Sequence, residues 1–353
     1  MDFPHLYQPI DLSGLSLKNR LVMAPMCQYS AVDGLLQNWH FRHYVERAQG
    51  GVSLLLVEAT AVSPEGRISP ADLGIWSTAH RDTFRHLVDQ VHAAGAKIGI
   101  QLAHAGRKAS TQVPWKGNGR VELSQGGWPV GGPGDLPFDP SYPVPKAMTN
   151  DELNRVVDDF AAAARRAVEA GFDVVEVHAA HGYLVHQFLS PLTNQRTDDW
   201  GGTPEKRRTL AVEITRAVRA AVGPDFPLFL RLSATDWVDG GWDVSGSIAL
   251  LEALKDQNLA LVDVSSGGVV PGAKIAVGPG YQVPFSAQIR RNTGLKTGAV
   301  GLITEAKQAE LILRQGEADV VLLGRQLLRD PYFPARHAPA GLRTVPAQYE
   351  RAF

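Results

Sequence analysis

Residues 174–183 read Val-Val-Glu-Val-His-Ala-Ala-His-Gly-Tyr, and this stretch decides the fold. Successive side chains of a strand point to opposite faces, so Val175 and Val177 share one face while Glu176 and His178 share the other. The first face is apolar and can pack against helices, whereas the second carries an acid and an imidazole. A parallel barrel delivers polar groups of this kind to a catalytic site at the C-terminal ends of its strands. The stretch therefore predicts a barrel strand that ends in an active site.

The same alternation of apolar strands and helical segments extends over the rest of the chain. Eight strands are expected, at residues 20–26, 53–60, 97–104, 174–179, 228–234, 261–266, 299–303 and 319–324. None of them is followed by the Gly-x-Gly-x-x-Gly turn of dinucleotide-binding sheets. Eight strand–helix units without a break in composition favour an α/β fold of the (β/α)8 TIM-barrel type over a doubly wound sheet. We expect one domain that spans residues 1–353.

Several helix boundaries are marked by local signals. Thr149 and Glu152 have the spacing of a capping box, which predicts a helix that starts there and ends at Gly171. A further helix is expected from Thr203, because proline follows it at the first helical position.

Residues 105–148 interrupt the alternation with many glycines and prolines, above all between 126 and 134. A segment of this length without periodicity is either a functional excursion or a linker. The alternation resumes directly after it, which favours a lid-like excursion that follows the third strand.

Composition excludes several classes of partner. The chain has 35 Lys and Arg against 36 Asp and Glu, a net charge of −1, and no basic run of the kind that binds nucleic acid or a membrane surface. It has neither a leader-like start nor a stretch of about 18 apolar residues, so we expect a soluble protein of the cytoplasm. Cys27 is the only cysteine, which excludes an intrachain disulfide and a cysteine-based metal cluster. A small-molecule partner is therefore expected.

In a barrel, the active site is built from residues at the C-terminal ends of the strands. Here these residues are Cys27, Ala59, Gln101, His178, Arg231, Gly301, Gly324 and Arg325, joined by His181 and Tyr183 in the loop after 174–179. The set has few carboxylates, so it suits binding and polarising a heteroaromatic or carbonyl group rather than activating water. The glycines after the last two strands are placed where barrels commonly bind phosphate.

Five motifs match one known family in a single order. They are residues 17–29, 99–108, 178–183, 319–331 and 349–351. On these motifs the sequence resembles the flavin-dependent ene-reductases of the old yellow enzyme family, in its thermophilic-like branch, from residue 17 to the C-terminus. The resemblance implies non-covalently bound FMN, NADPH as reductant, and reduction of a C=C bond activated by a carbonyl or nitro group. Enones, maleimides and nitroalkenes are such substrates.

The resemblance also implies a role for each cofactor-binding residue. Pro25, Met26, Cys27 and Ala59 would line the isoalloxazine ring, Gln101 would bond its pyrimidine edge, and Arg231 would lie near N1 and C2=O. Gly301, Gly324 and Arg325 would hold the ribityl phosphate. The nicotinamide and the substrate would use the same face of the flavin in turn, which explains why a separate dinucleotide motif is not needed.

The substrate contacts implied by the resemblance come from two histidines and two tyrosines. His178 and His181 would bind the activating oxygen, so that flavin N5 can deliver hydride to the β-carbon, and Tyr183 would protonate the α-carbon. Cys27 would tune the flavin potential and Tyr29 would bond the substrate. Arg351 would reach into the site of a neighbouring subunit, which implies a homodimer or homotetramer with the tail 338–353 at the interface.

Other interpretations stay open at this point. Arg231 could pair with Asp263 on the next strand, and the histidine pair could bind a metal ion, although a third ligand is not evident. As functions, a metal-dependent barrel hydrolase, a flavin-binding protein without activity and an amine demethylase are the alternatives. A dienoyl-CoA reductase with a second flavin domain is not favoured by a chain that ends after the barrel.

Overall fold

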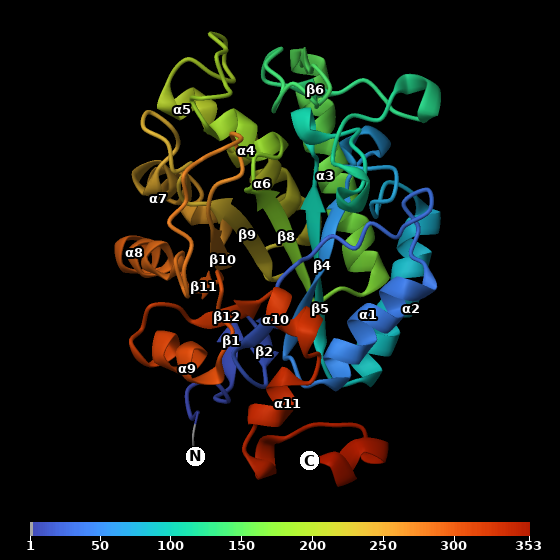
Figure 1. The fold of residues 1–353 in the computed structure, drawn as a ribbon. Coiled ribbons are helices and arrows are strands. Elements are labelled where there is room, and N and C mark those ends of the chain that lie inside the picture. The colour runs from blue at the N-terminus through green and yellow to red at the C-terminus, as the bar shows by residue number, and fades with distance from the viewer. Residues whose placement is uncertain (1–2) are drawn as a thin grey trace.

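Eight parallel strands close into a barrel in the computed structural model, which describes residues 3–353 (Figure 1). They are β3 (Leu21–Met23), β4 (Leu54–Ala61), β5 (Lys97–Ala103), β8 (Val174–Ala179), β9 (Leu228–Ser233), β10 (Leu259–Ser265), β11 (Thr297–Ala299) and β12 (Val320–Leu323). Their order around the barrel is their order in the chain, and β12 pairs with β3 to close the ring. This is the (β/α)8 arrangement, so the expected fold class is confirmed.

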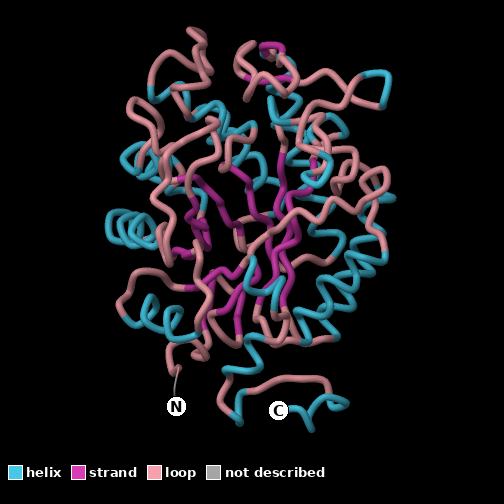
Figure 2. Tube along the Cα trace, in the orientation of Figure 1, coloured by secondary structure: helices cyan, strands magenta, loops and turns pink. Residues whose placement is uncertain are grey.

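Helices surround the strands on the outside of the barrel (Figure 2). The longer ones are α1 (Asn38–Gln49), α2 (Thr78–Ala93), α3 (Asn150–Ala170), α6 (Thr209–Val222), α7 (Val244–Ala253), α8 (Val283–Thr293) and α9 (Ala306–Arg314). The shorter ones are α4 (Leu184–Leu189), α5 (Pro204–Arg207), α10 (Arg325–Arg329) and α11 (Phe333–His337). Within residues 3–353, none of these helices is both long and apolar enough to span a bilayer.

The predicted helix boundaries hold at α3 but not at α5. The Thr149 side chain accepts a hydrogen bond from the Glu152 N–H, the Glu152 side chain accepts one from the Thr149 N–H, and Gly171 ends the helix at φ 93°. Thr203 likewise caps α5 through the Lys206 N–H. This helix ends after four residues, however, and α6 begins separately, so the single helix predicted there is two.

The core has an outer and an inner layer, as the alternation in each strand predicts. Val175 and Val177 belong to the large cluster between strands and helices, whereas Val174 and Phe229 belong to a cluster inside the barrel. The inner cluster also contains leucines of a hairpin formed by β1 (Ile10–Leu12) and β2 (Leu15–Leu17). Because its partners lie at the starts of the barrel strands, the hairpin closes the N-terminal end of the barrel. It was not predicted.

One barrel strand lies earlier in the chain than expected. The prediction placed it at 299–303, but β11 ends at Ala299. Gly301 has φ 124° and Leu302 has φ 50°, and neither conformation belongs to a strand. The apolar composition of this segment therefore reflects a loop whose side chains pack on the core, with Ile303 in the outer layer and Val300 against the inner one.

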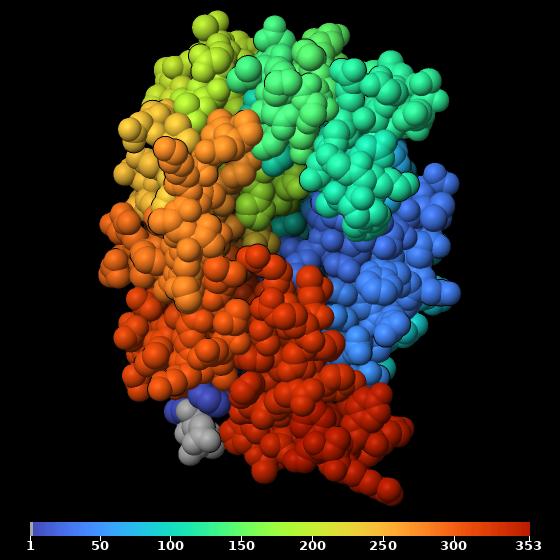
Figure 3. All heavy atoms as spheres, viewed as in Figure 1, coloured from blue at the N-terminus to red at the C-terminus, as the bar shows by residue number. Residues whose placement is uncertain are grey.

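The excursion at 105–148 lies at the C-terminal ends of the strands, at the top of Figure 1, and has little regular structure. Its only strands, β6 (Gly131–Gly132) and β7 (Lys146–Ala147), have two residues each. The Trp128 Nε1–H donates to the Glu65 carbonyl at 2.9 Å, and the Arg67 guanidinium lies 4.8 Å from the Trp128 ring centroid. These contacts fasten the excursion to the loop after β4. Figure 3 shows a hollow between the excursion and the orange segment that follows β10.

Candidate active site

Three predicted side chains meet at the C-terminal end of β8. The ring centroid of His178 lies 5.2 Å from that of His181 and 5.1 Å from that of Tyr183, and both pairs meet edge to face. His178 is in the strand, His181 lies in the following turn with φ 58°, and Tyr183 immediately precedes α4. The cluster that the sequence predicted is therefore present.

Both histidines are uncharged hydrogen-bonding groups. Burial, followed by the positive charge of Arg231, lowers the pKa of each imidazole well below its ordinary value. The His178 Nδ1 accepts the Ala180 N–H at 3.3 Å, so the proton of this neutral ring is on Nε2. The His181 Nε2 lies 2.7 Å from the Ser265 Oγ, which leaves Nδ1 for another partner. His178 can thus donate a hydrogen bond to a substrate oxygen without carrying a charge.

Tyr183 retains its phenolic proton in this environment. Burial, and next the neighbouring Cys27, raises the pKa of its hydroxyl well above the ordinary value. The Lys108 Nζ lies 5.1 Å from the Tyr183 ring centroid and donates hydrogen bonds to the carbonyls of His181 and Gly268. Tyr183 is therefore a weak acid beside a fixed ammonium group, which favours the phenolate once its proton has been given away.

The loop after β3 brings Pro25, Met26 and Cys27 to the same end of the barrel, all three only partly buried. Burial raises the pKa of the Cys27 side chain, so it is a thiol rather than a reactive thiolate. Two residues on, Tyr29 has φ 49° and packs edge to face against Trp115 of the excursion, with ring centroids 5.9 Å apart.

Glu58 supports this loop from behind, a role that the sequence did not reveal. Its Oε1 accepts the Gln28 N–H at 3.0 Å, and its Oε2 accepts the Tyr44 hydroxyl at 2.7 Å. Burial raises the pKa of Glu58 to about 8. The next residue of the same strand is Ala59, which lines a small cavity beside Tyr183. Asp72 lines the same cavity, and burial raises its pKa to about 6.

Four polar side chains form the floor of the site. The Gln101 Nε2–H donates to the Glu176 Oε1 at 2.8 Å, so the amide oxygen of Gln101 is left as an acceptor. The Arg231 Nε lies 3.2 Å from the Asp263 Oδ2, so the pairing that stayed open in the sequence is present. Burial raises the pKa of Glu176 to about 8 and also raises that of Asp263.

A second cavity, of about 190 Å³, lies beyond this floor at the ends of β11 and β12. It is lined by Gly301, Gly324 and Arg325, the three residues predicted to hold phosphate, together with Gln282. A Cβ at position 301 would lie 3.0 Å from the Gln282 Nε2, and φ is 124° there, so glycine is required. Met26 approaches Gly324, which connects this cavity to the loop after β3.

These residues fit a flavin nucleotide. The Arg231 side chain is only 7% exposed, yet its guanidinium makes no hydrogen bond to any of residues 3–353. Such donors need an acceptor, and the N1 and C2=O edge of a flavin is one that gains negative charge on reduction. The free Gln101 oxygen suits the flavin N3–H, and Arg325 suits a phosphate. The chain thus provides complementary groups at both ends of the cofactor.

Arg351 does not join the other site residues within its own chain. It lies exposed in the 3-10 segment Ala347–Ala352, and the tail that contains it is at the bottom of Figure 1, away from the excursion. No polar contact among residues 3–353 connects its side chain to the barrel mouth. Its role at a neighbouring subunit stays a prediction. Within the same described residues, three or more His, Cys, Asp or Glu side chains nowhere gather in an arrangement that could hold a metal ion.

Comparison with known proteins places this site in a family. The family described as NADH:flavin oxidoreductase / NADH oxidase matches residues 5–342. The NADPH dehydrogenase of Bacillus pumilus (strain SAFR-032) is 48% identical over 353 residues, 99% of each chain. That of Geobacillus thermodenitrificans (strain NG80-2) is 49% identical over 352 residues, 99% of this chain and 98% of the other.

A solved structure supports the same family assignment. Morphinone reductase in complex with tetrahydroNAD superposes with a TM-score of 0.80 at 30% identity, over 94% of this chain and 90% of that one. These matches confirm the resemblance to the old yellow enzymes that the five motifs indicated. The chain belongs to the NADH:flavin oxidoreductase / NADH oxidase family and is an oxidoreductase of the NADPH dehydrogenase type.

Proposed function

We propose that this protein is an FMN-dependent ene-reductase that reduces C=C bonds activated by a carbonyl or nitro group. The observation that carries the proposal is the cluster of two neutral histidines and one protonated tyrosine at the end of β8. A hydrolase would need a group that activates water. This cluster instead offers hydrogen-bond donors for an oxygen and a proton for a carbon.

The histidines would polarise the alkene. His178 can donate its Nε2–H to an oxygen, and His181 can donate an Nδ1–H in the tautomer whose Nε2 accepts the Ser265 hydroxyl. Both hydrogen bonds strengthen as negative charge moves onto that oxygen. FMN, when bound and reduced by NADPH, would supply the hydride for the β-carbon. Tyr183 would then transfer its hydroxyl proton to the α-carbon, leaving a phenolate that takes a proton from solvent. The overall reaction consumes one alkene, one NADPH and one proton, and yields the saturated product and NADP⁺.

The cofactor and partners follow from the same residues. Gly301, Gly324 and Arg325 line a cavity that suits the single phosphate of FMN, while Arg231 and Gln101 suit its ring. The substrates proposed are enones, maleimides and nitroalkenes. A homodimer or homotetramer in the cytoplasm, with Arg351 completing the site of a neighbour, is part of the proposal.

The proposal is tested by separating the two half-reactions in the Tyr183→Phe variant. Loss of a general acid costs about 10²–10⁴-fold in rate, so re-oxidation of the reduced flavin by 2-cyclohexenone should slow by that order. Reduction of the flavin by NADPH should stay close to the wild-type rate, because it requires no proton from Tyr183.

Tyr7→Phe is the matched control, since it also removes a buried hydroxyl, one that donates to the Pro334 carbonyl at 2.6 Å far from the site. It should leave both half-reactions unchanged. If Tyr183→Phe slowed both half-reactions equally, its role as the proton donor would be wrong.

A further inference from the structure

The turn that carries His181 and Tyr183 has an unusual backbone. His181 has φ 58° and Gly182 has φ 72°, so two successive residues are left-handed. A Cβ on Gly182 would lie 2.1 Å from the Gly268 carbonyl oxygen, which means that the turn is also pressed against the loop after β10. A backbone of this kind persists only where the surrounding structure holds it.

Hydrogen bonds hold the turn from several sides. The His181 N–H donates to the Ser233 Oγ at 3.0 Å, and its carbonyl accepts the Lys108 Nζ at 2.9 Å. The Gly182 carbonyl accepts the Gln187 Nε2–H at 2.7 Å. The remaining donor is the Gly182 N–H, which lies between the two residues that touch the substrate in the proposed reaction.

His186 provides the acceptor for that donor. Its Nδ1 accepts the Gly182 N–H at 2.9 Å from one turn further along the chain, in α4. The imidazole is fully buried. Because Nδ1 accepts, a neutral ring carries its proton on Nε2, and that atom lies 3.0 Å from the Asp236 Oδ1. The ring is thus hydrogen-bonded at Nδ1 and lies in close polar contact with the carboxylate at Nε2, without hydrogen-bond geometry there.

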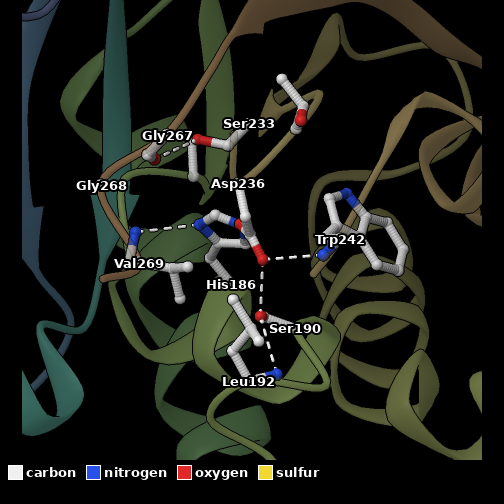
Figure 4. A network of polar contacts seen from close by, with 12 residues as sticks. His186, Ser190, Leu192, Ser233, Asp236, Trp242, Gly267, Gly268 and Val269 are labelled. Atoms are coloured by element: carbon white, nitrogen blue, oxygen red, sulfur yellow. Dashed lines mark hydrogen bonds and ion pairs between the residues drawn. The ribbon is translucent and has the colours of Figure 1, made fainter. Parts of the chain in front are cut away.

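Asp236 is itself fixed, as Figure 4 shows. It is fully buried, and its Oδ2 accepts the Ser190 hydroxyl at 2.6 Å and the Trp242 N–H at 2.8 Å. Burial opposes ionisation, but the contacts with His186 and Ser190 outweigh it and lower the pKa of Asp236, so it is a carboxylate. A buried anion therefore lies in close contact with the His186 ring, and His186 holds the turn through its bond to the Gly182 N–H.

We propose that His186 and Asp236 are positioning residues for the reduction of the alkene. They act through Gly182 by holding the turn so that the His181 ring and the Tyr183 hydroxyl keep their mutual geometry. Neither touches the substrate. The inference rests on the proposed function, but it concerns residues that lie outside the five motifs.

The expected effect is selective for one half-reaction. Without an acceptor, the Gly182 N–H is buried and unpaired, and the turn relaxes to regain a partner. A displacement of about 1 Å in a reacting group can cost about 10²-fold in rate. The groups that suit the flavin lie on β5, β9 and the loops after β3, β11 and β12, so flavin binding does not depend on this turn, and reduction of the flavin by NADPH needs no proton from Tyr183.

Two amide variants of the holoenzyme form a matched pair. In His186→Asn the amide can place an oxygen where Nδ1 was, which keeps the bond to the Gly182 N–H and loses the contact with Asp236. In His186→Gln the longer side chain places its amide near Nε2, which loses the bond to Gly182. Both variants bury a neutral polar group of similar volume, so a general loss of stability affects them alike.

The measurements are anaerobic flavin reduction by NADPH, re-oxidation by 2-cyclohexenone, and titration of the oxidised enzyme with a phenol. We expect His186→Gln to slow re-oxidation by about 10- to 100-fold and to weaken phenol binding, while flavin reduction stays within about twofold. His186→Asn should recover most of the loss. Asp236→Asn keeps the shape of the side chain but removes its charge, and its re-oxidation rate should lie between those of the two His186 variants.

Equal re-oxidation rates in His186→Asn and His186→Gln would overturn the proposal, as would an equal loss in both half-reactions. If both His186 variants unfold, the test is the ratio of the re-oxidation rate to the flavin-reduction rate in Asp236→Asn. A ratio equal to that of the wild type overturns the proposal. Failure of the proposed function is a different result, because the wild-type flavin would then not be re-oxidised by the enone at all.

Discussion

Burial determines the protonation state of His178 and His181. Both rings lie close to the Arg231 guanidinium, in surroundings where a second positive charge is disfavoured, and the pKa of each falls well below its ordinary value. A neutral imidazole can still donate one strong hydrogen bond. The site can therefore bind an oxygen that gains negative charge without burying a charged imidazolium ring.

This arrangement predicts the behaviour of His178→Ala and His181→Ala. A hydrogen bond to a charged acceptor contributes about 1.5–3 kcal/mol, so each change should weaken the binding of a phenolate to the oxidised enzyme by about 10- to 100-fold. The measurement is a titration followed by the visible spectrum of the bound flavin. His86→Ala, on the exposed surface of α2, is the control and should leave the affinity unchanged.

The pH dependence of that titration has a definite sign. Because the pKa of His178 and His181 is lowered, the rings stay neutral through the range in which an ordinary histidine titrates, and the affinity should follow the ionisation of the phenol alone. An additional transition near the ordinary histidine pKa of about 6.5 would contradict the neutral state of the rings.

The residues found from the sequence are those whose position repeats from strand to strand. Gln101, His178 and Arg231 each face inward near the end of a parallel strand, so their meeting follows from the fold. Glu58 and Asp236 act on the site through other residues. Their partners, Gln28 and His186, are far away in the chain, and no spacing in the sequence indicates that they meet.

At the scale of one element, β4 combines a structural and a functional task. Glu58 lies in the middle of this strand, fully buried, and bonds the loop of Cys27 on one side and Tyr44 of α1 on the other. Its pKa rises from an ordinary value of 4.5 to about 8 because of burial. The strand thus carries a protonated acid that links the cofactor loop to the outer helix.

The raised pKa of Glu58 predicts how stability changes with pH. The folded state binds the Glu58 proton more tightly than the unfolded state does. The stability that Glu58 contributes is therefore complete below about pH 4.5 and is lost as the pH rises toward about 8. Relative to Glu58→Gln, which stays neutral, the wild-type free energy of unfolding should fall by up to about 1.4 kcal/mol per pH unit in that window. Denaturant unfolding at several pH values measures this difference.

Glu252→Gln, on the exposed face of α7, controls for the loss of a surface carboxylate. A constant difference between the wild type and Glu58→Gln across the window would show that Glu58 is ionised in the folded protein.

Element by element, the strands with regular alternation were predictable and the irregular segments were not. The hairpin β1–β2 was missed although Ser13 and Gly14, both with positive φ, form the kind of two-residue turn that joins short strands. β11 was placed too late because the apolar residues of the next loop continue its composition. In that loop Ile303 belongs to the core between strands and helices and Val300 packs against the inner cluster, while both also line the cavity of about 190 Å³.

On the scale of the whole molecule, the C-terminal tail stands apart from the barrel. Leu342 and Tyr349 are 50% and 48% exposed, which is high for large apolar side chains. Tyr349 and Phe353 pack against Tyr332, so the tail has a defined course over its own surface. In the proposed homo-oligomer, a second copy of the chain would cover these residues and bring Arg351 to a neighbouring site.

Deletion of residues 349–353 tests this arrangement. We expect a smaller assembly by analytical ultracentrifugation and weaker substrate binding, with the flavin still bound because its site is built from the barrel alone. Arg351→Ala is the matched control, because it should raise KM while the assembly stays intact. Unchanged assembly and unchanged KM in the deletion variant would exclude a role for the tail at the neighbour's site.

The most direct test of the whole interpretation is a single anaerobic titration of the purified protein, followed by its visible spectrum. We predict flavin absorption bands that bleach on addition of NADPH and return in full on addition of 2-cyclohexenone. Bands that bleach but do not return would contradict alkene reduction, and a protein that stays colourless after incubation with FMN would contradict the flavin site itself.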